Sequence, residues 1–220
     1  MCTSPHQHPD ALILIDFHMG RLPLGLDLVV SAHLNLCPAC RREAELLDAV
    51  GGEFLDQVEG VAMSDDSVEL ALARTERQAS GPARSPTTPE QEFLTALRLP
   101  KAFHKFRVCR RRWVAPGVWI ADIDAPRTGK AEKTYLMSAR GGMVMPAHSH
   151  RSTEVTLVIR GQVDDGLGLF GPGDFVVRDA EISHTPAMAG DQDCLCLVWQ
   201  NASIRPSTWL GRVLQPLAGI

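Results

Sequence analysis

Apolar side chains recur at three- and four-residue intervals along the first 78 residues of this 220-residue chain. This spacing places them on one face of a helix, so it predicts a helical N-terminal region. So short a region buries little core, and we expect an additional constraint such as a bound metal to stabilise it. The residues that carry the pattern are Leu12, Leu14, Ile15, Leu22, Leu26, Val29 and Val30.

Proline, glycine and capping side chains mark where these helices begin and end. Pro38 directly follows Cys37, which is typical of the first turn of a helix whose cap is Cys37. We expect this helix to end at Gly51-Gly52, because glycine disfavours a helix interior. A further helix is expected after Ser64-Asp65-Asp66, whose side chains can cap it, and should run to Gln78.

The composition changes twice beyond residue 78. Residues 79–91 contain three prolines and few apolar side chains, which indicates a linker. From Phe93 onward the apolar positions alternate with polar ones in short runs separated by glycine-rich turns, which predicts strands in a sandwich or barrel. The sequence therefore predicts a two-domain α + β protein, with a helical bundle at 1–78, a linker at 79–92 and a β-barrel at 93–220.

Composition and charge narrow the class of protein further. Hydrophobic residues make up 45% and charged residues 22%, as in ordinary globular proteins, and the net charge of −4 argues against a nucleic-acid surface. The N-terminus lacks the basic start and apolar core of a signal peptide, and the longest apolar run, 11–15, is too short to span a bilayer. We therefore expect a cytoplasmic protein whose six cysteines are metal ligands or reactive thiols.

His33, Cys37 and Cys40 form the pattern H-x3-C-x2-C, and a pair of histidines, His6 and His8, lies near the N-terminus. Two thiolates and two imidazoles are the ligand set of a tetrahedral structural zinc site. A helix break between the cysteines would bring the ligands together at a corner, where His8 or His6 completes the set. The alternatives are a redox C-x2-C pair, which normally occurs in a βαβ unit that this sequence does not predict, or ordinary helix positions.

A second group of metal-binding side chains comprises His148, His150, Glu154 and His184. His148, His150 and Glu154 share one face of a strand by parity, and His184 would approach from a neighbouring strand. Three imidazoles and a carboxylate bind a divalent metal, for which we expect Zn2+, with Mn, Fe and Ni as alternatives. A metal-free barrel, or a set of surface histidines, is the remaining interpretation.

Cys194 and Cys196 lie on a predicted strand and face the same side. On an extended strand their Cα atoms would be about 6.6–7 Å apart, at or beyond the reach of a disulfide. A bridge between them would therefore need a local distortion. Packing of two small thiols inside the barrel is the simplest interpretation.

These motifs resemble those of a known family. The H-x3-C-x2-C pattern at 33–40, with residues 29–37 and 48–52 around it, is similar to the zinc-binding anti-sigma domain, and an ungapped match makes His8 the upstream ligand rather than His6. Residues 142–161 match the first cupin motif, Gly-x5-His-x-His-x3-Glu-x6-Gly, and the Gly171-Pro172-Gly173 turn with His184 matches the second. Nearly the whole chain resembles the ChrR-type anti-sigma factors, which join these two domains.

The resemblance implies a regulator that is not an enzyme. It implies that the zinc domain holds an extracytoplasmic-function-type sigma factor in a one-to-one complex, and that the metal-binding cupin (a double-stranded β-helix) receives an oxidant signal such as singlet oxygen or peroxide. The family also carries the C-x-C pair, at Cys194 and Cys196 here, which is implicated in that response. The acidic character of residues 43–76 suits a basic, DNA-binding partner, and no direct contact with nucleic acid or membrane is expected.

An enzyme remains the alternative function. The same three histidines and glutamate serve cupin dioxygenases, in which an open metal position binds substrate or O2. In that case the N-terminal zinc domain would be a docking module.

Overall fold

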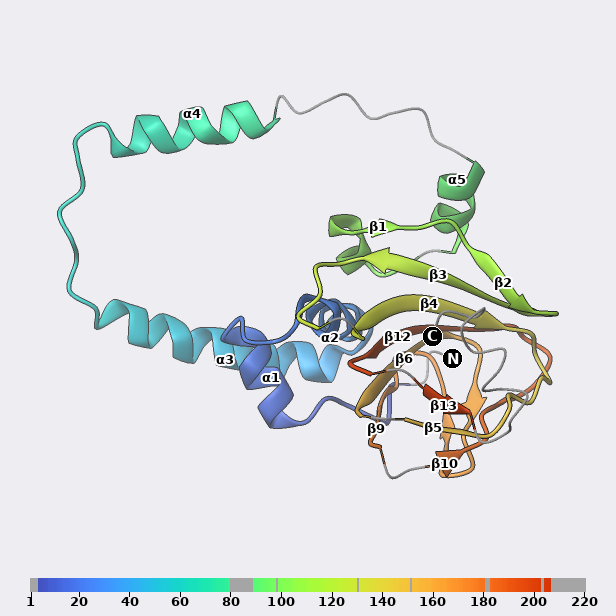
Figure 1. The fold of residues 1–220 in the computed structure, drawn as a ribbon. Coiled ribbons are helices and arrows are strands. Elements are labelled where there is room, and N and C mark those ends of the chain that lie inside the picture. The colour runs from blue at the N-terminus through green and yellow to red at the C-terminus, as the bar shows by residue number, and fades with distance from the viewer. Residues whose placement is uncertain are drawn as a thin grey trace.

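The computed structural model describes residues 4–79, 89–97, 99–129, 131–150, 152–180, 183–202 and 204–206. Its N-terminal part is helical, as predicted, and helices are followed by a sheet-rich barrel (Figure 1). The helices are α1 (Ala11–His18), α2 (Leu24–Leu36), α3 (Pro38–Asp56), α4 (Ser67–Ala79), α5 (Pro89–Ala96) and a short 3-10 helix, η1 (Lys101–Lys105).

The predicted end of α3 at Gly51-Gly52 is wrong, because the helix continues to Asp56. A Cβ atom at either glycine would meet no atom within 4 Å, so both lie on an open helix surface. Glycine lowers helix propensity by about 1 kcal/mol relative to alanine, but unlike proline it keeps its N–H and breaks no backbone hydrogen bond. The helical conformation of the flanking residues is therefore sufficient to keep Gly51 and Gly52 within α3.

The alternation expected from Phe93 onward begins later, because α5 and η1 precede the first strand. Of the predicted linker, residues 80–88 lie outside the described part of the chain. Phe93 is in α5 and packs edge-on against Trp119, with 5.6 Å between the ring centroids.

In the described part of the chain, the barrel is built from antiparallel strand pairs in three sheets. The large sheet has the order β1-β3-β4-β12-β6-β9, with β2 also paired to β3, and the smaller sheets are β10-β5-β13 and β11-β7-β8. The strands are β1 (Arg107–Val108), β2 (Arg112–Ala115), β3 (Val118–Asp124), β4 (Lys133–Ala139), β5 (His148–His150), β6 (Glu154–Arg160), β7 (Val163–Asp164), β8 (Leu169–Phe170), β9 (Phe175–Arg178), β10 (Ser183–His184), β11 (Ala187–Met188), β12 (Cys194–Gln200) and β13 (Ile204–Pro206).

The two faces of the large sheet belong to different apolar clusters. Along β12, Leu195, Leu197 and Trp199 face the helices, where α2 packs on the sheet, whereas Cys194 and Cys196 face the barrel interior. Because side chains alternate along a strand, this central strand connects the two clusters. The helical region and the barrel therefore share a core.

Close packing of α2 on the sheet depends on Gly25. A Cβ atom at this position would lie only 2.0 Å from Thr134 Oγ1 and 2.7 Å from the indole ring of Trp199. Only glycine leaves room for the helix backbone at this distance. The contact fixes α2, and with it the α2–α3 corner, against the barrel.

Helices α3 and α4 extend away from the barrel (Figure 1). Many apolar side chains are exposed to solvent on α3 from Leu46 onward, on the segment at 57–66 and on α4. They are Leu46, Val50, Phe54, Leu55, Val58, Val61, Met63, Val68, Leu70 and Leu72. Among the described helices, none has the length and hydropathy needed to cross a membrane.

Candidate metal sites

Four side chains from three segments converge at the α2–α3 corner. The ligand atoms of His8, His33, Cys37 and Cys40 all lie within 4.8 Å of one another. His8 Nδ1 is 3.5 Å from Cys37 Sγ and 3.3 Å from Cys40 Sγ. The structure thus groups the residues that the sequence spacing singled out, with His8 rather than His6 in the cluster.

The chain direction at Cys37 explains how the two helices form this corner. Cys37 has extended backbone angles, φ −108° and ψ 106°, between the end of α2 and the start of α3. Its Sγ accepts a hydrogen bond from the N–H of Cys40 at 3.5 Å, so Cys37 caps the helix that carries the next thiol. Pro38 occupies the first turn of α3, where a missing N–H costs nothing.

The fully buried imidazole of His33 is arranged as a ligand. Its Nδ1 donates a hydrogen bond to the carbonyl oxygen of Gly173 at 2.8 Å, so the lone pair is on Nε2. Nε2 is buried and has no hydrogen-bond partner among the described residues. Burial lowers the pKa of His33 to about 4, which keeps the ring neutral and able to bind a metal.

The two thiols also favour a bound cation. Burial, and then the neighbouring Cys37, raise the pKa of the Cys40 thiol to about 12. Two adjacent thiolates are therefore unfavourable here unless a positive charge compensates them. A cluster of two sulfur and two nitrogen donors could hold a metal ion, and the donor set fits tetrahedral zinc.

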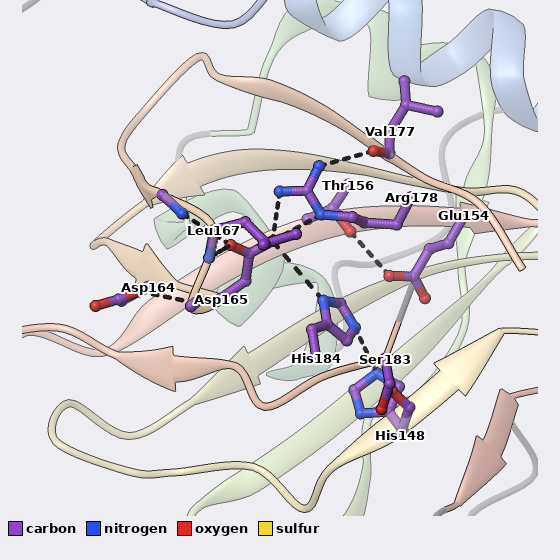
Figure 2. A network of polar contacts seen from close by, with 12 residues as sticks. His148, Glu154, Thr156, Asp164, Asp165, Leu167, Val177, Arg178, Ser183 and His184 are labelled. Carbon is purple, nitrogen blue, oxygen red and sulfur yellow. Dashed lines mark hydrogen bonds and ion pairs between the residues drawn. The ribbon is translucent and has the colours of Figure 1, made fainter. Parts of the chain in front are cut away.

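In the barrel, His148 and His184 face each other from paired strands (Figure 2). Their Nε2 atoms lie 3.0 Å apart. His148 Nδ1 donates to the carbonyl oxygen of Pro146 at 2.9 Å, and His184 Nδ1 lies 3.8 Å from the Asp165 carboxylate. Burial lowers the pKa of His148, and lowers that of His184 to about 4, so both rings are neutral and direct Nε2 toward the same point.

Glu154 does not share a strand with His148 and His150, as the parity argument predicted, because β5 ends at His150 and Glu154 begins β6, a strand of the large sheet. Its carboxylate is nevertheless directed into the same region (Figure 2). The hydroxyl of Thr156 donates to it at 3.4 Å, and burial raises its pKa to about 7. Among the described side chains, however, the compact group of four ligand atoms occurs at the N-terminal site and not here. His150 is on β5, but its side chain lies outside the described part of the chain, so the four-ligand barrel site stays a prediction.

Sequence reasoning missed the charged groups that surround His184. Asp165 Oδ2 accepts a hydrogen bond from Arg178 Nε at 2.7 Å, and Oδ1 accepts from the N–H groups of Leu167 and Gly168 at 2.9 and 3.1 Å (Figure 2). Burial alone would raise the pKa of Asp165, but these hydrogen bonds outweigh it and hold the pKa below its ordinary value. The Asp-Gly-x-Gly stretch at 165–168 is typical of a turn, but it does not indicate which charged groups that turn holds.

Cys194 and Cys196 are buried free thiols in the barrel interior, with their Sγ atoms 3.6 Å apart. The pairing of β12 with β6 shifts register between Leu195 and Cys196, which is a local distortion of the strand. The hydrogen bond with Cys194, together with burial, raises the pKa of Cys196 well above its ordinary value. As it stands, this thiol is a weak nucleophile, and its sensing role stays a prediction.

A Cys2His2 corner between helices, packed on a barrel with paired inward histidines, is the architecture expected of a zinc anti-sigma domain joined to a cupin. Residues 105–204 match the ChrR Cupin-like domain family. The chain is 34% identical over 215 residues to the Anti-sigma-E factor ChrR of Cereibacter sphaeroides, an alignment that covers 97% of this chain and 98% of that protein.

The chain therefore belongs to the ChrR family of cupin anti-sigma factors. A solved structure supports this over most of the chain. The crystal structure of Rhodobacter sphaeroides SigE in complex with the anti-sigma ChrR contains a chain of similar fold, with a TM-score of 0.70 and 30% identity. The match covers 90% of this chain and 100% of that one.

Proposed function

We propose that this protein is an anti-sigma factor that binds an extracytoplasmic-function-type sigma factor one to one and holds it inactive. The observation that carries the proposal is the exposed apolar surface of α3, residues 57–66 and α4. Phe54 and Leu55 are 67% and 71% exposed, and Val61 is 87% exposed. Soluble proteins rarely leave so many large apolar side chains uncovered unless a partner covers them.

Charge on the same segment favours a basic partner. Acidic residues are interspersed with the apolar ones from Glu43 to Glu76, and sigma factors bind DNA through basic surfaces. An amphipathic helix that presents alternating apolar and acidic side chains can lie along a groove of such a partner. Covering surfaces that the sigma factor needs for core RNA polymerase would keep it inactive.

Zinc at His8, His33, Cys37 and Cys40 would have a structural role in this function. The ion would join the N-terminal segment, the end of α2 and the first turn of α3. Since α3 carries the proposed contact surface, the metal would set the direction in which that helix leaves the barrel. The functional division that we propose is a zinc anti-sigma domain at 1–78, a linker at 79–92 and a cupin domain at 93–220.

The cupin domain is proposed to receive an oxidant signal of the singlet oxygen or peroxide type. The groups that would take part are a divalent metal, preferably Zn2+, at His148, His150, Glu154 and His184, and the thiols of Cys194 and Cys196. Release of the sigma factor requires two states of the protein with different affinity for it. We propose that these events occur in the cytoplasm, without contact of the protein with nucleic acid or membrane.

The test is binding of an extracytoplasmic-function sigma factor from the same organism by the full chain, followed by in vitro transcription. Leu55→Asp should weaken binding and relieve inhibition, because it places a charge in the proposed apolar contact. Leu169→Asp is the matched control, since Leu169 is also an exposed leucine of the barrel, at 57% against 71%. Equal binding by both variants would contradict the proposed surface, and no binding by the unmodified chain would contradict the function.

The enzyme alternative has a separate measurement. We expect the purified full chain to contain redox-inert zinc and to consume no O2 with small substrates. Iron or nickel at the barrel site together with substrate-dependent O2 consumption would establish a cupin dioxygenase instead.

A further inference from the structure

The turn at 171–175, which leads into strand β9, lies directly against the N-terminal metal cluster. The carbonyl oxygen of Gly173 accepts the hydrogen bond from His33 Nδ1 at 2.8 Å. The ring of Phe175 packs edge-on against the same imidazole, with 5.7 Å between the centroids. The barrel therefore helps to orient one ligand of the N-terminal site, together with the helix that carries it.

The second imidazole is held by the same turn, through the backbone that precedes it. Asp174 Oδ1 accepts hydrogen bonds from the N–H groups of His6 and Gln7 at 2.6 and 2.9 Å. The N–H of Phe175 in turn donates to the carbonyl oxygen of Gln7 at 3.0 Å. These three bonds fix the segment immediately before His8.

The Asp174 carboxylate accepts hydrogen bonds within its own turn as well as from the N-terminal segment. Its side chain is almost fully buried, with 2% of the residue exposed, and its Oδ2 accepts from the N–H of Gly171 at 2.7 Å. A single carboxylate thus satisfies donors from both the barrel and the N-terminal segment. A buried carboxylate with this many donors is strongly constrained in position.

Gly173 allows the two chains to come this close. Its φ of +94° lies in the region that favours glycine, and a Cβ atom there would be 2.5 Å from Pro5 Cγ. Any larger residue would displace the N-terminal segment or the turn. The close contact is thus specified by the sequence of both partners.

The same strand reaches the barrel site at its other end. Strand β9 begins at Phe175 and ends at Arg178, whose guanidinium holds Asp165 beside His184 (Figure 2). A four-residue strand therefore connects the contacts of the N-terminal cluster with those of the barrel histidines. A displacement of β9 would therefore alter the contacts of the N-terminal cluster and those of the barrel histidines.

We propose that the 171–175 turn is a clamp by which the barrel sets how firmly the N-terminal site holds its zinc, with β9 as the physical link to the barrel histidines. The clamp deepens the proposed function and rests on it, because it assumes zinc in the cluster of two cysteines and two histidines. It supplies a route by which a change in the cupin domain alters the helices that bind the partner.

The first test replaces the clamp carboxylate in the full chain. Asp174→Asn keeps the size of the buried side chain but places an amide N–H where an acceptor for the N–H of Gly171 is needed. We expect zinc to transfer from the N-terminal site to a chromogenic chelator about 10-fold faster, the lower end of the effect of losing a group that orients a metal ligand. Asp191→Asn, an exposed aspartate of the same domain, is the control and should match the unmodified protein.

A second measurement uses a different variant, so its result does not depend on the folding of Asp174→Asn. Cys37→Ser removes a ligand of the N-terminal site and leaves the turn unaltered in sequence. We expect the amide hydrogens of Gly171 and Phe175 to exchange faster in this variant, since coupling between sites is reciprocal, while those of β3 (Val118–Asp124) stay unchanged. Unchanged exchange at the turn, or zinc transfer from Asp174→Asn at the unmodified rate, would overturn the clamp.

These readouts do not involve the sigma factor, so the clamp and the proposed function fail in different ways. Absence of zinc from the N-terminal cluster of the unmodified chain would refute the clamp and the structural role proposed for zinc, whereas absence of sigma-factor binding would refute the proposed function. The clamp alone would be refuted if the protein contains zinc and inhibits the sigma factor, but Asp174→Asn transfers zinc at the unmodified rate.

Discussion

Hydrogen bonds to backbone carbonyl groups decide which nitrogen of His33 and of His148 faces its metal site. His33 donates Nδ1 to Gly173, 140 residues away along the chain, and His148 donates Nδ1 to Pro146. The ligand residues could be predicted because thiols and imidazoles at fixed spacing are recognisable in sequence. Their acceptors could not, because any residue offers a backbone carbonyl and only the tertiary fold selects which one is used.

Cys37→Ser should remove zinc from the N-terminal site and abolish inhibition of the sigma factor. Cys37 supplies a ligand and also caps α3 through its Sγ. Zinc contributes roughly 10–16 kcal/mol of coupled folding free energy in small zinc domains. Because α2 also packs on the barrel, the loss of zinc should destabilise the α2–α3 corner without unfolding α2. Zinc content and in vitro transcription measure the effect, and Cys109→Ser, a free cysteine outside both sites, is the control. Normal repression by Cys37→Ser would contradict a zinc scaffold.

Asp165→Asn should weaken metal binding at the barrel site by about 10-fold. The amide that replaces the carboxylate beside His184 carries no negative charge, so it loses the ion pair with Arg178. Competition with a metal indicator measures the affinity. The neighbouring Asp164→Asn serves as a control, since Asp164 is exposed and its side chain accepts a hydrogen bond from the N–H of Gly166. Equal affinity in the two variants would show that Asp165 does not position the ligand.

At the scale of elements, the local sequence patterns predicted where helices begin better than where they end. Pro38 and the capping residues at 64–66 located the starts of α3 and α4, which begin at Pro38 and Ser67. The end of α3 was misplaced, because two glycines weaken a helix without removing a hydrogen bond. Helix α5 was missed since its sequence begins with proline inside a segment whose composition is typical of a linker.

Replacing both glycines of α3 with alanine should stabilise the last turns of that helix by about 1–2 kcal/mol, because alanine has the higher helix propensity and each new Cβ meets open space. Hydrogen exchange over residues 50–56 should slow accordingly. Gly60→Ala, at an equally open position outside the helix, should leave the exchange of these amides unchanged. No slowing in the double variant would indicate that helix propensity does not limit the stability of these turns.

At the scale of the whole molecule, the helical part and the barrel share an apolar core that the sequence did not predict. The proline-containing stretch was predicted to separate a helical part from a sheet-rich part, but α5 and η1 follow it, and α2 packs into the same apolar cluster as β6 and β12. Amphipathic periodicity identifies an apolar helix face without revealing what covers it. For that reason the shared core could not be predicted, although the fold class of each part could.

A fragment of residues 1–92 should still inhibit the sigma factor but no longer release it on oxidant treatment. The proposed contact surface and all four N-terminal ligands lie within the fragment, whereas the proposed receiver does not. Because the fragment uncovers the face of α2 that packs on the barrel, it should be produced together with the sigma factor. In vitro transcription with and without oxidant is the measurement, and release by the fragment would show that the cupin domain is not the receiver.

The projecting α3–α4 arm also has a consequence for turnover of the protein. Residues 57–66 join the two helices as non-helical chain, with Val61 and Met63 largely exposed. Such segments are the preferred sites of proteolytic cleavage, and a bound partner would cover this one. Degradation would then remove the molecules that lack a partner first, so the cellular amount of the inhibitor would follow the amount of its target.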